Sequence, residues 1–171
     1  MQQFDFRRKG RKCSVSDREF EPGEMFHSAL IEQADGSCQR VDIAEREWDG
    51  EPEHCIGSWK LRVPDLQSGQ VYWAPRDVIV AFFEHVLADE RQQAAAMVMS
   101  LLMQQKRMVV LKEVLETDEG ESHLIADRKT NQMWEVPVVE VSADEASTIQ
   151  ETLAEQLFSD QPVVLDDEPV E

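Results

Sequence analysis

Residues 108–141 read MVVLKEVLETDEGESHLIADRKTNQMWEVPVVEV, and this stretch decides the fold class. It holds three runs rich in β-branched and other apolar residues, at 108–116, 122–129 and 133–141. The triplets Asp118-Glu119-Gly120 and Lys129-Thr130-Asn131 separate the runs, and both are typical of turns. We therefore expect three antiparallel strands that form a meander. Proline cannot donate a hydrogen bond to a strand ladder, so Pro137 places the third strand at a sheet edge.

Two helices are expected before this meander. Apolar residues between Val78 and Leu87 follow the i, i+3, i+4 spacing of an amphipathic helix, and Pro75 suits its first position. Asp89 is placed to cap a second helix that runs to about Lys106. The segment Ala94–Met103 is apolar on nearly all sides, so this second helix is expected to be the most buried one.

The chain before the helices, residues 13–74, is typical of short strands and turns. The run MFHSALIE at 25–32 predicts a strand, and SCQRVDI at 37–43 predicts the strand that returns. Asp35-Gly36 lies between them and is a hairpin signal. The run IGSWKLRVP closes this part. The pattern predicts a small β-rich module.

Together these patterns predict an α+β protein: a small β-rich N-terminal module, two helices, a three-stranded antiparallel meander and a C-terminal helix. The last helix is expected after Ser142, which forms a capping-box pattern with Glu145. The predicted organisation is a basic flexible arm, a β-rich module, an α+β unit and an acidic disordered tail, at 1–12, 13–74, 75–158 and 159–171.

Charge separates these parts. The 171-residue chain has a formal net charge of −18. The net charge is +4 over residues 1–12, −8 over 13–74, zero over 75–108 and −14 over 109–171. A field of this sign repels nucleic-acid phosphates and anionic lipids and attracts basic protein surfaces. We therefore expect no nucleic acid on the acidic body, no membrane association and a basic protein partner, and leave the oligomeric state open.

The residues best suited to bind a metal are the cysteines Cys13, Cys38 and Cys55, with His54 beside the last. Zinc takes about four such ligands in a tetrahedron, and they usually come in closely spaced pairs. This sequence has no C-x-x-C pair. Buried structural thiols are the main expectation, and a zinc-binding, ribbon-like module that uses these four residues is the alternative. Three cysteines make a poor disulfide framework, which favours a cytoplasmic location.

A resemblance supports this architecture. The segments CSVSDREFEPGEMFHSALIE, WKLRVP and LLMQQKRMVVL, at 13–32, 59–64 and 101–111, are similar to a pattern in uncharacterised small acidic bacterial proteins. The N-terminal part of those proteins looks like a degenerate zinc ribbon. They have no assigned activity, so the resemblance implies an architecture and no function.

No catalytic pattern is present. The sequence lacks G-x-x-x-x-G-K-[ST], G-x-G-x-x-G, H-E-x-x-H and G-x-S-x-G. His54 and Cys55 are adjacent, and on an extended chain adjacent side chains point to opposite faces, so they are not expected to form a dyad. We therefore expect a soluble, non-enzymatic module for protein–protein interaction, with a strongly acidic surface.

Overall fold

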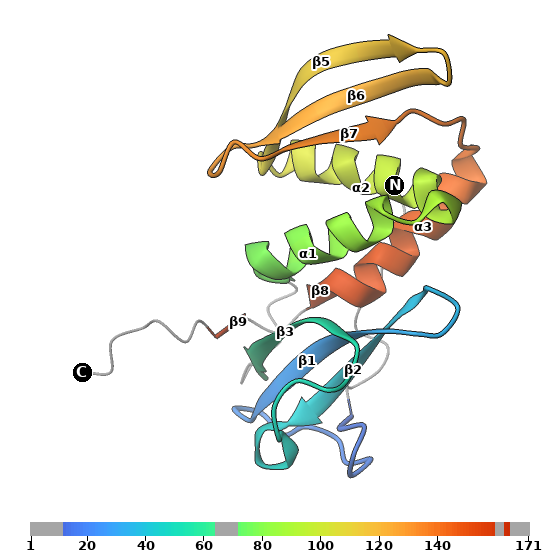
Figure 1. The fold of residues 1–171 in the computed structure, drawn as a ribbon. Helices are drawn as coiled ribbons and strands as arrows, with labels where there is room; N and C mark the ends of the chain where they lie inside the picture. The colour runs from blue at the N-terminus through green and yellow to red at the C-terminus, as the bar shows by residue number, and fades with distance from the viewer. Residues whose placement is uncertain (1–11, 64–71, 160–162, 165–171) are drawn as a thin grey trace. The chain divides into compact units, whose positions relative to one another are not determined.

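The computed structural model describes residues 12–63, 72–159 and 163–164. The predicted basic arm, apart from Lys12, lies outside these residues, as does most of the predicted acidic tail. Figure 1 shows the elements in chain order. They are β1 (Met25–Glu32), β2 (Cys38–Ala44), η1 (Glu45–Glu47), β3 (Cys55–Arg62), β4 (Tyr72–Trp73), α1 (Arg76–Leu87), η2 (Glu90–Gln92), α2 (Gln93–Gln105), β5 (Val109–Thr117), β6 (Gly120–Asp127), β7 (Met133–Pro137), α3 (Ala143–Leu157), β8 (Phe158–Ser159) and β9 (Val163–Val164).

The predicted α+β class is confirmed. Helices and antiparallel sheets occur in the same chain, and the strand orders are β2-β1-β3-β9, β4-β8 and β5-β6-β7. The chain divides into two compact units. The first comprises Met1–Phe82 with Ala154–Glu171, and the second comprises Phe83–Leu153. The divisions fall inside α1 and α3, so each of these helices contributes residues to both units.

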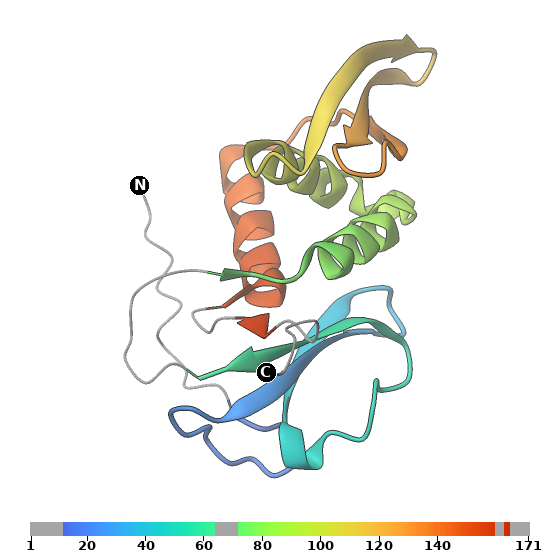
Figure 2. The same ribbon diagram turned by 90° about the vertical axis from the view of Figure 1, so that its left-hand side faces the viewer.

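The sheet of the first unit is built around β1, which is the run predicted at 25–32 (Figure 2). β1 pairs with β2 on one side and with β3 on the other, both antiparallel. The predicted hairpin signal is confirmed: Gly36 has a φ of 87°, and its N–H donates to the Gln33 carbonyl at 3.0 Å. Phe26 and Leu30 share one face and are fully buried, as the alternation requires.

A buried polar network ties the end of α3 to this sheet. The Arg40 guanidinium lies 3.3 Å from Asp42 and donates to the Ser28 hydroxyl at 3.0 Å and to the Phe158 carbonyl at 2.8 Å. The Ser28 hydroxyl donates to the Asp42 carboxylate. The Arg40 guanidinium also lies over the Trp59 ring, 4.9 Å from its centroid. The partners named here all belong to the first unit. The network joins Arg40 to Phe158, which lies 118 positions later in the chain.

The second unit contains the meander. β5, β6 and β7 pair antiparallel in chain order, as predicted. β7 is an edge strand, which confirms the position inferred from Pro137. Trp134 and Val136 share the buried face of β7, and the Phe83 ring meets Trp134 edge-on with centroids 5.5 Å apart. α2 packs against β5 and β7.

Two helix details refine the sequence analysis. Asp89 is a cap as expected, but its carboxylate accepts from the Arg91 N–H and so begins η2, while α2 begins at Gln93. Ser142 caps α3 as predicted, because its hydroxyl accepts from the Glu145 N–H at 3.1 Å. The expectation that α2 is the most buried helix is not confirmed, since Leu101 is 44% exposed and α1 has as many buried residues as α2, five each.

The Arg40 network generates a stability prediction. Arg40→Met removes the guanidinium that pairs with the Asp42 carboxylate at a site where the two side chains are only 4% and 10% exposed. Breaking a buried pair in this way costs about 3–5 kcal/mol, so we expect a loss of that order in the free energy of urea unfolding. Adding Asp42→Asn to Arg40→Met also removes the buried carboxylate charge and should recover part of the loss. If Arg40→Met alone were as stable as the wild type, the ion pair between Arg40 and Asp42 would contribute little to stability.

Candidate functional site

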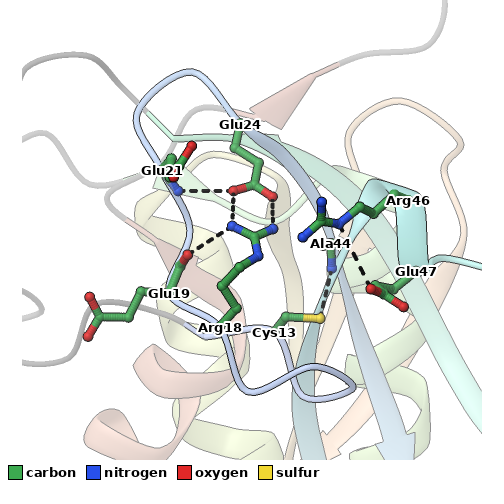
Figure 3. A network of polar contacts seen from close by, with 8 residues as sticks. All are labelled: Cys13, Arg18, Glu19, Glu21, Glu24, Ala44, Arg46 and Glu47. Atoms are coloured by element: carbon green, nitrogen blue, oxygen red, sulfur yellow. Dashed lines mark hydrogen bonds and ion pairs between the residues drawn. The ribbon is translucent and has the colours of Figure 1, made fainter.

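The first predicted metal ligand, Cys13, lies in a tight loop at the start of the described chain (Figure 3). The loop closes through two backbone hydrogen bonds, from Cys13 N–H to the Arg18 carbonyl and from Asp17 N–H to the Cys13 carbonyl. Asp17 has a φ of 56°, in the left-handed region that Asp tolerates better than most residues. The Cys13 sulfur is buried and accepts from the Ala44 N–H at 3.3 Å.

This environment favours the thiolate form of Cys13. Burial raises the pKa of the thiol. Hydrogen bonds from the Ala44 backbone, from Ser16 and from the Val15 backbone lower the pKa by more than burial raises it, so the net pKa lies below the ordinary value. The loop therefore holds the sulfur as a hydrogen-bond acceptor that joins the start of the described chain to the end of β2.

Cys38 and Cys55 lie on either side of β1. Cys38 is opposite Glu32, and Cys55 is opposite Ile31. Because Ile31 and Glu32 are neighbours on one strand, the two cysteines lie on opposite faces of the sheet. Burial raises the pKa of Cys38 to about 11, and the charge of Glu32 adds to this effect.

Cys55 is also held in its neutral form. Burial raises the pKa of its thiol, the Glu51 charge raises it further, and a backbone hydrogen bond at Gly57 offsets part of the rise. His54 precedes it with a φ of 61°, and the carbonyl of His54 accepts from the Glu32 N–H at 2.9 Å. Both thiols therefore hold their protons more tightly than an ordinary cysteine does.

The four predicted zinc ligands are not brought together. The Cys13 sulfur is hydrogen-bonded to the Ala44 N–H at the end of β2, whereas Cys38 is the first residue of that seven-residue strand. At about 3.3 Å per residue those ends are about 20 Å apart, whereas zinc–sulfur bonds are about 2.3 Å long. Within residues 12–63, 72–159 and 163–164, no three His, Cys, Asp or Glu side chains are placed to share a metal ion.

An ion pair lies beside the Cys13 loop. The Arg18 guanidinium donates to both oxygens of the Glu24 carboxylate (Figure 3). The bond from Nη1 to Oε1 is 3.0 Å long, and Nη2 and Oε2 form the salt bridge. The hydrogen bond with Glu24 raises the pKa of Arg18, and the same bond lowers the pKa of Glu24. A cavity of about 430 Å³ adjoins the pair. Because Glu24 also accepts from the Glu21 N–H, the pair closes the turn at Glu21–Glu24.

A second cavity lies where the β5–β6 hairpin turns, wholly inside the second unit. It has a volume of about 550 Å³ and is named the hairpin cavity here. Its lining residues are Gln93, Thr117, Asp118, Glu119, Gly120, Glu121, Ser122, Glu135, Pro137, Val138 and Val139. Four of these residues carry a carboxylate, and none is Lys, Arg or His.

Hydrogen bonds fix the backbone of the hairpin turn that carries Asp118 and Glu119. The Thr117 hydroxyl donates to the Gly120 carbonyl at 2.9 Å and accepts from the Glu119 N–H at 3.3 Å. Gly120 has a φ of 124°, which is readily adopted only by glycine. The sequence predicts the turn but not the cavity, since carboxylates are common throughout the chain. No sequence pattern marks the cavity, because Glu135 joins the lining only through the pairing of β6 with β7.

The comparisons with known proteins add no identity. No family model matches the chain, and no curated protein or solved structure matches it. In the described residues, no helix is both long enough and apolar enough to cross a membrane.

The thiol environments predict opposite responses to pH. The lowered pKa of Cys13 means that ionisation stabilises the folded state, so its contribution grows as the pH rises toward the ordinary thiol value of 9.0. Cys13→Ala should cost about 1–3 kcal/mol by removing the acceptor of the buried Ala44 N–H, and the deficit should widen from pH 7 to pH 9. Urea unfolding at each pH measures this difference.

Cys38→Ala is the matched control. The pKa of Cys38 is raised to about 11, so its contribution should stay level up to about pH 9 and fall above it. Equal pH profiles for the two variants would contradict the assigned thiol environments.

Proposed function

We propose that this protein is a non-enzymatic interaction module that binds a basic segment of a partner protein at the hairpin cavity. The observation that carries the proposal is the composition of the lining: four of the residues around a space of about 550 Å³ are acidic, and none of the lining residues is basic. Such a site complements lysine or arginine side chains, which carry the opposite charge and donate hydrogen bonds to carboxylates.

The charge of the surrounding chain supports this choice of partner. Residues 109–171 carry a net charge of −14. A field of that strength accelerates the approach of basic proteins and opposes nucleic acids and anionic lipids. The three thiols are free in the structure, which is the usual state in a reducing compartment, and the cytoplasm is the proposed location.

The test removes charge from the hairpin turn without changing its shape. The triple variant Asp118→Asn, Glu119→Gln and Glu121→Gln should weaken binding of a fluorescein-labelled lysine decapeptide by about tenfold, since each lost carboxylate removes attraction. Fluorescence anisotropy at about 0.01 M and 0.15 M salt measures the affinity. The wild type should bind more weakly at the higher salt concentration because the exposed charges are screened.

A second triple variant controls for net charge. Asp144→Asn, Glu145→Gln and Glu151→Gln make the same chemical changes at exposed positions of α3. This control should reduce the affinity by less than twofold. An equal loss in both triple variants would mean that the peptide responds to the overall charge, and the hairpin cavity would then have no special role.

A further inference from the structure

The exposed apolar side chains of the second unit concentrate on β5. Val110 and Leu111 are each 39% exposed, and Val114 is 49% exposed. Lone exposed apolar residues are common on protein surfaces, whereas three of them on one edge strand leave apolar surface along that edge. β5 is also an outer strand of the β5-β6-β7 sheet.

The strand register places these side chains on both faces of the sheet. Val110 is opposite Ala126, while Leu111 is opposite Ile125. Because Ala126 and Ile125 are adjacent in β6, Val110 and Leu111 lie on opposite faces. Val114 is opposite His123, two residues from Ile125, and so shares the face of Leu111. β5 therefore exposes apolar surface above and below one sheet edge.

We propose that the outer edge of β5 is a docking site for an extended basic segment of a partner protein, which adds to the sheet as a further strand. This inference rests on the proposed function and names the form in which the basic partner binds. An added strand places alternate side chains on both faces of the sheet, so it contacts Val114 on one face and the half-buried Leu115 on the other. A docked helix would cover only one of these faces.

A β-bulge limits where that strand pairs. The β5–β6 register shifts between Leu111 and Glu113, which leaves Lys112 as the extra residue. Bulges and lysines on edge strands discourage pairing, so the regular run Glu113–Thr117 is the part of β5 that remains available. Within it, Val114 and Leu115 lie between the exposed carboxylates of Glu113 and Glu116. A segment with the pattern Lys-Val-Val-Lys complements this run in charge and in apolar contact.

The negative charge of the β5–β6 hairpin favours a basic partner protein, rather than a second copy of this chain, as the added strand. Residues 109–127 contain six acidic side chains and one lysine. Two copies of the hairpin would bring these carboxylates together, and like charges on paired strands are destabilising. Each chain also carries −18 overall, which opposes self-association at low salt.

Two peptides of equal charge test strand addition. One carries the core Lys-Val-Val-Lys and the other Lys-Val-Pro-Lys, in identical flanking sequences. Proline removes a ladder donor and disfavours an added strand, so the wild type should bind the first peptide about tenfold more tightly. Two-dimensional NMR of the ¹⁵N-labelled protein should place the largest shifts in residues 109–117. Equal affinities for the two peptides would overturn the docking mode.

Val114→Lys tests the same docking site by changing the protein instead of the peptide. It puts a positive charge on the docking run and should weaken the Lys-Val-Val-Lys peptide by more than tenfold. Val15→Lys is the matched control, because Val15 is a 61% exposed valine in the first unit. It should change the affinity by less than twofold. Urea unfolding of both variants establishes that they are folded, and equal effects on binding would overturn the inference.

The outcomes separate this inference from the proposed function. If both peptides bind equally and the triple variant of the hairpin cavity still weakens them, the cavity binds basic segments without strand addition. If neither peptide binds the wild type, the proposed function fails as well. If Val114→Lys instead converts a dimer to a monomer in analytical ultracentrifugation, the edge pairs with a second copy, and the basic partner is excluded.

Discussion

The buried contacts of Arg40 are the constraint on which the first unit depends. One guanidinium binds the Asp42 carboxylate, the Ser28 hydroxyl and the Phe158 carbonyl at a largely buried site. Gln156 adds a second tie by donating to the Cys38 carbonyl at 2.7 Å. These polar contacts are directional, unlike apolar packing, and they set the point at which the end of α3 meets β2.

The second unit separates its apolar packing from its charge. One face of the meander is covered, with Trp134 and Val136 buried, while β5 and the hairpin turn are left exposed. The carboxylates gather at that turn. The strand pairing and the hydrogen bonds of the turn hold the backbone that carries these carboxylates, and such pre-organisation lowers the entropic cost of binding a partner. The proposed interaction therefore follows from the sheet as well as from the composition.

Local patterns predicted much of this fold. β1 occupies the predicted residues, and both the Asp35-Gly36 hairpin and the Ser142 cap are present, because each depends on nearby side chains. The pairing of Val163–Val164 with β3 was not predicted, since residues 159–171 read as an acidic tail. Two residues give too short a pattern, and what makes them a strand is the edge of β3, distant in sequence.

The candidate site was less predictable for the same reason. Cysteine and histidine stand out in a sequence, but the register puts Cys38 and Cys55 on opposite faces and Cys13 at the far end of β2. The carboxylates around the hairpin cavity are common residues, and only the pairing of three strands brings Glu135 to the lining. The thiols were predicted as a site from their residue type alone. The acidic cavity was not predicted, because it depends on strand pairing between residues distant in sequence.

The most direct measurement of the central claim is an NMR titration of the ¹⁵N-labelled full chain with lysine decapeptide. Binding at the meander predicts saturable shifts in residues 109–139, with the amides of the 118–121 turn moving most. The carboxylate-rich segment 45–53 of the first unit should remain unchanged. Shifts of equal size in both segments, or shifts that never saturate, would contradict a defined binding site.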